Sequence, residues 1–166
     1  MKSSIDHEKI FFNYFLTKPH YLKGTGDGFF SNRDLDHIAK LSKQFYLKFG
    51  ESPSKDQMKA LIADDPNEIS TDIVTSIYDI NINEYDQDWL KRTGEAWVKW
   101  KHFDKQLIRT IEYVKTQDVS PENVEDVVNR AIGMISTDGS INFDTDVGLD
   151  FFNPESHVQR TSKKIE

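Results

Sequence analysis

The chain has 166 residues, of which 37% are hydrophobic and 30% charged, and its formal net charge is −7. This length suits one domain with an appendage and excludes two large domains. The acidic balance disfavours a protein that coats DNA, and the absence of cysteine excludes disulfides, thiolate catalysis and cysteine-containing zinc sites. No apolar run approaches the roughly 20 residues that span a bilayer, so we expect a cytoplasmic protein without membrane contact.

Helix signals follow one another closely at the start of the chain. Residues 4–17 are apolar on nearly every side, which is typical of a helix at the centre of a core. A capping box at residues 31–34 begins a second, amphipathic helix that ends before Gly50.

Two shorter helices complete this part of the chain. A capping box at residues 54–57 begins the third helix, and Pro66 limits its length. Apolar residues recur at helical spacing over residues 69–78 and mark the fourth helix. We therefore predict a small helical head over residues 1–86 in an all-α protein.

The next segment predicts a long antiparallel helical hairpin over residues 87–136. Its first helix runs to about residue 117 without a proline. Gly94 is the weak point, because glycine inside a helix costs about 1 kcal/mol relative to alanine, so a kink or a later start is the alternative to one continuous helix. Ser120 as N-cap and Pro121 at the first helical position begin the second helix.

The last segment, residues 137–166, predicts an extended linker. Turn residues and an alternation of polar and apolar side chains replace helical spacing there. The sequence closes without a folded element, and we expect its continuation to lie elsewhere.

Two motifs resemble ligand-binding loops only in part. Gly24, Gly26 and Gly28 lack the preceding strand of a dinucleotide fingerprint and the Gly-Lys-Ser/Thr of a P-loop, so we interpret them as a turn. The acidic residues of 142–150 place a glycine one position late for a calcium-binding EF-hand and lack its closing glutamate. We interpret them as part of a solvated linker.

The sequence contains no recognisable catalytic pattern. Its five histidines are scattered, and no two have the i, i+4 spacing that presents a metal ligand pair from one helical face. Neither a nucleophile elbow nor a zinc-protease motif occurs. We therefore predict no catalytic residue, no cofactor and no metal in this chain, and neither binding nor hydrolysis of ATP.

Aromatic and basic residues alternate between Trp89 and Lys105 in the long predicted helix. Such a pattern can stack nucleic-acid bases beside positive charge. We favour a structural interpretation, in which Trp97 and Trp100 pack on the neighbouring helix and the lysines face water. A protein interface, where aromatic residues are enriched, is the intermediate alternative.

Surplus apolar surface on the predicted hairpin indicates self-association. Two helices that pack only on each other cover one apolar stripe apiece, and this hairpin carries more than that. The candidate interface residues are Trp97, Trp100, Phe103, Leu107, Ile111, Val124, Val128, Ile132 and Ile135.

Four segments, in this order, resemble the N-terminal region of DnaB-like hexameric replicative DNA helicases, most closely those of tailed phages. FFNYFL (residues 11–16) and the stretch that ends in FGESPS (residues 35–54) are similar to the family's head. DWLK (residues 88–91) resembles the start of the hairpin in phage members, and INFDTDVGLDF (residues 141–151) resembles the linker that precedes the motor.

This resemblance implies a non-catalytic collar that assembles into a ring and docks primase or a helicase loader. The family's RecA-like motor, which would hold ATP and magnesium and would make most contacts with single-stranded DNA, follows the linker and is absent from this chain. The alternative is a stand-alone phage adaptor, a loader or inhibitor that binds a replication protein. The reading frame beyond Glu166 would separate the two.

Overall fold

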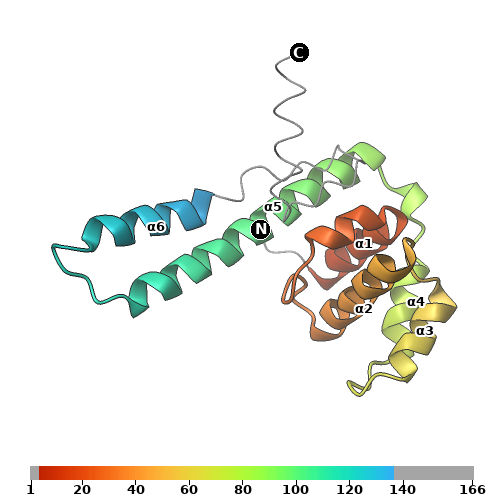
Figure 1. The fold of residues 1–166 in the computed structure, drawn as a ribbon. Helices are drawn as coiled ribbons and strands as arrows, with labels where there is room; N and C mark the ends of the chain where they lie inside the picture. Colours follow the sequence, from red (N-terminus) through yellow and green to blue (C-terminus); the bar gives the residue numbers. More distant parts are fainter. Residues whose placement is uncertain (1–3, 137–166) are drawn as a thin grey trace, which may run out of the picture. The chain divides into compact units, whose positions relative to one another are not determined.

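Helices form all the regular structure of residues 4–136, the part of the chain that this computed structural model describes (Figure 1). In chain order they are α1 (Ile5–Thr17), η1 (Pro19–Gly24), α2 (Arg33–Phe49), α3 (Lys55–Ala63), α4 (Thr71–Tyr78), η2 (Ile82–Glu84), α5 (Gln87–Thr116) and α6 (Val124–Ser136), where η1 and η2 are 3₁₀ helices. These residues contain no strand, so the predicted all-α class is confirmed. The linker predicted over residues 137–166 lies outside the described residues.

None of these helices combines the length and the hydrophobicity that crossing a bilayer requires.

Two compact units divide the chain after Lys101. The sequence predicted a boundary after residue 86, and the structure places it later, in the middle of α5. The reason is burial, because Leu90, Trp97 and Val98 of α5 belong to the apolar core of the first unit.

Local sequence sets the helix ends. The side chain of Asn32, rather than that of Ser31 as predicted, caps α2 by accepting a hydrogen bond from the Leu35 amide at 2.9 Å. At the other end of α2, Gly50 adopts a φ of 77°, a left-handed conformation that glycine takes without strain. The capping box predicted for α3 is present, with Ser54 and Gln57 each bonding the other's backbone amide.

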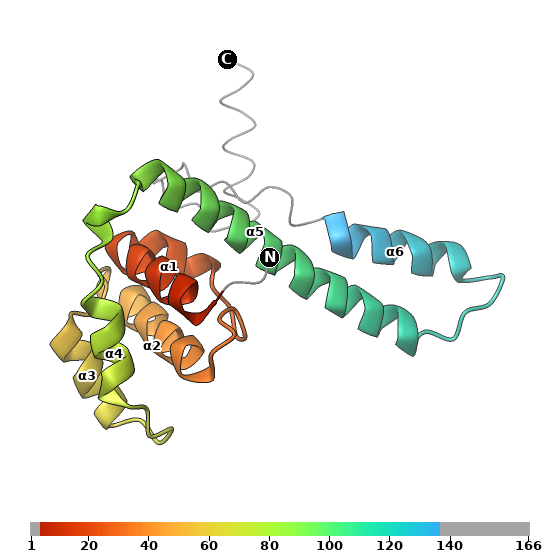
Figure 2. The ribbon, with the colours of Figure 1, turned by 180° about the vertical axis from the view of Figure 1, so that it is seen from behind.

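Helix α1 is the centre of the first unit. Both views show it between α2 and the first part of α5 (Figures 1 and 2). Its rings Phe11, Phe12, Tyr14 and Phe15 are all buried, which confirms the core position predicted from its apolar circumference. The Asn13 side chain donates a buried hydrogen bond of 2.9 Å to the carbonyl of Ile77 and so ties α1 to α4.

Gly94 lies inside a continuous α5, so the predicted long helix has neither a break nor a later start at this residue. A β-carbon on Gly94 would lie 3.4 Å from Phe15 Cε1 and 3.5 Å from Phe11 Cδ1. These are ordinary van der Waals distances, so there is room for a methyl group at this position between α5 and the α1 rings.

In the second unit, the last part of α5 and α6 run in opposite directions, joined by residues 117–123 (Figures 1 and 2). The guanidinium of Arg130 lies 4.9 Å from the centroid of the Tyr113 ring, which links the two helices. Helix α6 begins at Val124 rather than at Pro121 as predicted. Residues 121–123 form a turn in which the Ser120 amide donates to Asn123 Oδ1 at 2.7 Å.

Candidate self-association surface

The predicted interface residues fall into three environments. Trp97 is only 1% exposed and packs in the first unit, where its ring centroid lies 4.7 Å from that of Phe29, 5.4 Å from that of Phe30 and 5.6 Å from that of Phe11. Assigning Trp97 to the hairpin interface was therefore wrong. The spacing of Trp97 and Trp100 in the sequence did not reveal that α5 begins in the first unit and ends in the second.

Trp100 and Phe103 are partly exposed, but each already has an interaction partner. Trp100 also belongs to the first unit and Phe103 to the second. We therefore define the candidate surface by the remaining six predicted residues, all of the second unit. These are Leu107, Ile111, Val124, Val128, Ile132 and Ile135, called the α5–α6 surface below.

On α5, Thr110 is buried and marks the side of the helix that faces away from solvent. At roughly 100° per residue, Leu107 and Ile111 lie about 60° and about 100° around the helix from Thr110, in the same rotational sense. Leu107 is half-buried and Ile111 is exposed. These two side chains thus form a stripe beside the buried side of α5.

On α6, Val127 is the buried residue. Val124, Ile135, Val128 and Ile132 lie about 60°, 80°, 100° and 140° from Val127, again in one rotational sense. Val124, Val128 and Ile132 are exposed, Ile132 by 59%, and Ile135 is half-buried. Helix α6 therefore also carries an apolar stripe beside its buried side.

The two stripes lie on the same side of the pair. The two helices run in opposite directions. A rotation of the same size and sense around each helix axis, starting from the buried face, therefore leads to the same side of the pair. Tyr113 and Arg130 provide an independent check, since both lie about 60° from the buried residue of their helix in the opposite sense, and they contact each other. One side of the pair thus holds this cation–π contact, and the other side carries both apolar stripes.

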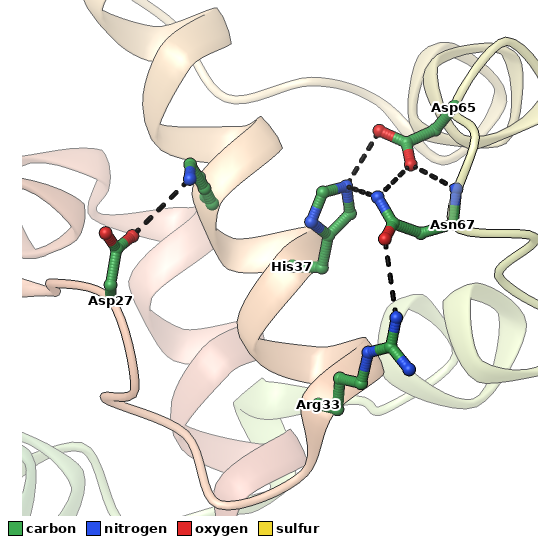
Figure 3. A network of polar contacts seen from close by, with 6 residues as sticks. Asp27, Arg33, His37, Asp65 and Asn67 are labelled. Carbon is green, nitrogen blue, oxygen red and sulfur yellow. Dashed lines mark hydrogen bonds and ion pairs between the residues drawn. The ribbon is translucent and has the colours of Figure 1, made fainter.

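The first unit also contains a cluster of polar side chains, which lies where α2 meets the connection between α3 and α4 (Figure 3). His37 Nε2 is 2.7 Å from Asp65 Oδ2, and the Asn67 side chain donates to Asp65 Oδ1 at 2.7 Å. Hydrogen bonds from His37 and from the backbone and side chain of Asn67 hold the pKa of the Asp65 carboxyl at about 2, well below its ordinary value. Arg33 lies 3.5 Å from Asn67 Oδ1 at the edge of this group.

This polar cluster joins helices and offers no clear chemistry. It brings no serine or threonine hydroxyl to His37 in the contacts of residues 4–136. Across the same residues, no three His, Cys, Asp or Glu side chains are grouped so that they could hold a metal ion. Sequence patterns did not reveal the cluster, because His37 and Asp65 are 28 positions apart and form no local motif.

A scan against protein-family models, a search of curated proteins and a search of solved structures find no match to the chain.

Proposed function

We propose that this chain is a non-catalytic assembly module, the N-terminal collar of a DnaB-like replicative DNA helicase, whose α5–α6 surface pairs with a second copy. The observation that carries the proposal is the apolar side of the second unit. Monomeric proteins rarely expose apolar patches larger than roughly a few hundred Å², and patches above that size usually mark an interaction site. The family resemblance described above supports the helicase assignment.

A second copy is the simplest partner for this surface. A two-fold axis brings the same patch of both copies together, so an apolar stripe on each helix meets an equivalent stripe. Burial of about 800 Å² at about 25 cal/mol per Å² gives a gross gain near 20 kcal/mol, of which association entropy and imperfect pairing remove most. The expected result is a weak dimer from this surface alone.

Cysteine cross-linking tests this pairing, because the natural chain contains no cysteine. Val128→Cys is expected to give disulfide-linked dimers under mild oxidation, since a residue near a two-fold axis lies close to its own copy. Val119→Cys is the matched control, an exposed valine in the connection outside both stripes. Equal dimer yields from the two variants would contradict pairing through the α5–α6 surface.

The helicase assignment has a separate test. A Walker A sequence in the reading frame that follows Glu166 is expected, together with primase or loader binding by the collar. A stop codon there would instead favour the stand-alone adaptor. In either case the chain itself is proposed to lack nucleotide hydrolysis, and saturable micromolar ATP binding would contradict this part of the proposal.

A further inference from the structure

One exposed side of α5 in the second unit carries a charge pattern that is complementary to itself. Four exposed side chains share this side: Asp104, Ile108, Ile111 and Lys115. Their spacing of i, i+4, i+7 and i+11 puts them within about 60° of one another around the helix. We call them the α5 stripe. It has an acidic end, two central isoleucines and a basic end, so turning it end over end exchanges the two charges.

The α5 stripe lies on the same side of the helix pair as the α5–α6 surface. Its residues lie about 100° to 160° around α5 from the buried Thr110, in the rotational sense that also leads to Leu107. Ile111 belongs to both sets. A partner that covers the α5–α6 surface therefore also meets the two charged ends of the α5 stripe.

Both charged ends of the α5 stripe are open to a partner. The side chains of Asp104 and Lys115 form no ion pair within residues 4–136. Eleven residues at 1.5 Å each separate them by roughly 16 Å along the helix, so they cannot pair within one chain. Each of these charges therefore needs an opposite charge from another molecule.

The apolar stripe of α6 has a matching symmetry. Val124 and Ile135 stand at its two ends, and Val128 and Ile132 stand between them. Both of these pairs are centred at about residue 130. In an antiparallel pair of α6 helices, each end residue would thus face the opposite end residue, and each central residue the other central one.

The centres of the two stripes lie at nearly the same height in the hairpin. The centre of the α5 stripe, between Arg109 and Thr110, lies about 10 Å before the end of α5 at Thr116. The centre of the α6 stripe lies about 9 Å beyond the start of α6 at Val124. Because the helices are antiparallel and joined at these ends, one two-fold axis perpendicular to them can pass both centres.

A second copy fits this arrangement better than another class of partner. Nucleic acid would be repelled by Asp104 and would leave the isoleucines exposed. A second copy, turned end over end, presents Lys115 to Asp104 and Ile111 to Ile108. It therefore matches the charged ends and the apolar centre of the α5 stripe at once.

We infer that two copies pair with α5 antiparallel on α5 and α6 antiparallel on α6. The two-fold axis passes α5 between Arg109 and Thr110, and Asp104 of each copy faces Lys115 of the other. This inference rests on the proposed pairing of the α5–α6 surface and adds its orientation. With the axis parallel to the helices instead, Asp104 of one copy would stay roughly 16 Å along the helices from Lys115 of the other.

Charge reversal in the full chain, followed by mixing, tests the orientation. Asp104→Lys and Lys115→Glu should each raise the Kd of the dimer about tenfold at low ionic strength, because each puts two like-charge contacts into one dimer. An equimolar mixture of the two variants has opposite charges at both contacts. Its Kd, measured by sedimentation, should return to within about threefold of the wild-type value, as should that of the double variant.

Arg109→Glu is the matched control. Arg109 is an exposed residue of the same helix, it lies on the opposite side of α5, and its replacement changes the net charge as Lys115→Glu does. This variant should keep the wild-type Kd. Its mixture with Asp104→Lys should stay weaker than the complementary mixture, although the net charges of the two mixtures are equal. Circular dichroism verifies that every variant keeps its helix content.

Two results would overturn the inference. The first is a wild-type Kd for either single variant, and the second is a complementary mixture that pairs no more tightly than the control mixture. If Ile132→Asp weakens the dimer while charge reversal has no effect, the α5–α6 surface still pairs, but in another orientation. A wild-type chain that stays monomeric at millimolar concentration would contradict both the pairing and its orientation.

Discussion

Replacement of Trp97 by alanine should destabilise the first unit far more than the same change at Trp100, three residues away. Trp97 is almost fully buried among the rings of α1 and of residues 29–30, while Trp100 is about half exposed. A tryptophan removes roughly 150–250 Å² from water, and its truncation in a core typically costs about 3–5 kcal/mol. For Trp100→Ala we expect a loss below about 1 kcal/mol, as at most surface positions.

Trp97→Phe refines this prediction. The indole Nε1 of Trp97 is buried without a hydrogen-bond partner among the described residues. Phenylalanine keeps one ring in the cluster and removes this unsatisfied donor, which offsets part of the lost packing. We therefore expect Trp97→Phe to cost about 1–2 kcal/mol, clearly less than Trp97→Ala.

Urea unfolding followed by far-UV circular dichroism measures these differences without depending on the fluorescence of the replaced residue. With a denaturant slope of about 1–3 kcal/mol per molar urea, a loss of 4 kcal/mol lowers the midpoint by about 2 M. Equal losses for Trp97→Ala and Trp100→Ala would refute the assignment of the first part of α5 to the core of the first unit.

Substitutions at three further positions test individual contacts by the same unfolding assay. Gly94→Ala should raise the free energy of unfolding by up to about 1 kcal/mol, because a β-carbon there makes ordinary contact with Phe15 and alanine favours helix. Gly94→Leu should lower the free energy of unfolding by about 1–3 kcal/mol through overpacking. A leucine variant more stable than the alanine variant would contradict this. Asp65→Asn should destabilise the protein at neutral pH and flatten its acid dependence. A carboxyl whose pKa falls from 3.8 to about 2 on folding stabilises the fold above pH 4 and loses this contribution as pH falls toward 2, so an unchanged acid profile would be inconsistent with the network. Glu8→Ala should cost about 1–3 kcal/mol, because the buried Glu8 carboxylate accepts the Ser31 amide at 3.0 Å; a neutral effect would exclude this role.

Sequence patterns predicted the helices well because caps and apolar spacing are local properties. The box at Ser54, the glycine at the end of α2 and the apolar circumference of α1 all have the structural role expected of them. The start of α6 was missed by three residues, since the Asn123 side chain and the Ser120 amide form a turn that competes with the helix.

Such local patterns could not predict which side chains the tertiary structure buries. Trp97 and Trp100 look alike in the sequence, and only the packing of α1 against α5 distinguishes them. Gly94 suggested a kink, whereas α5 is continuous at this residue and lies against Phe11 and Phe15. For the candidate surface, the apolar residues of both helices were recognised in advance, but their common side follows from the antiparallel arrangement and from the contact between Tyr113 and Arg130.

Sedimentation analysis of the full chain across the micromolar to millimolar range is the most direct test of the proposed assembly function. Wild type should show a reversible increase in mass with concentration. Ile132→Asp should shift this increase to concentrations roughly tenfold higher or more, because an aspartate within the α5–α6 surface must be desolvated on pairing. Val119→Asp, outside both stripes, should match wild type, and a wild-type chain that stays monomeric throughout would contradict self-association.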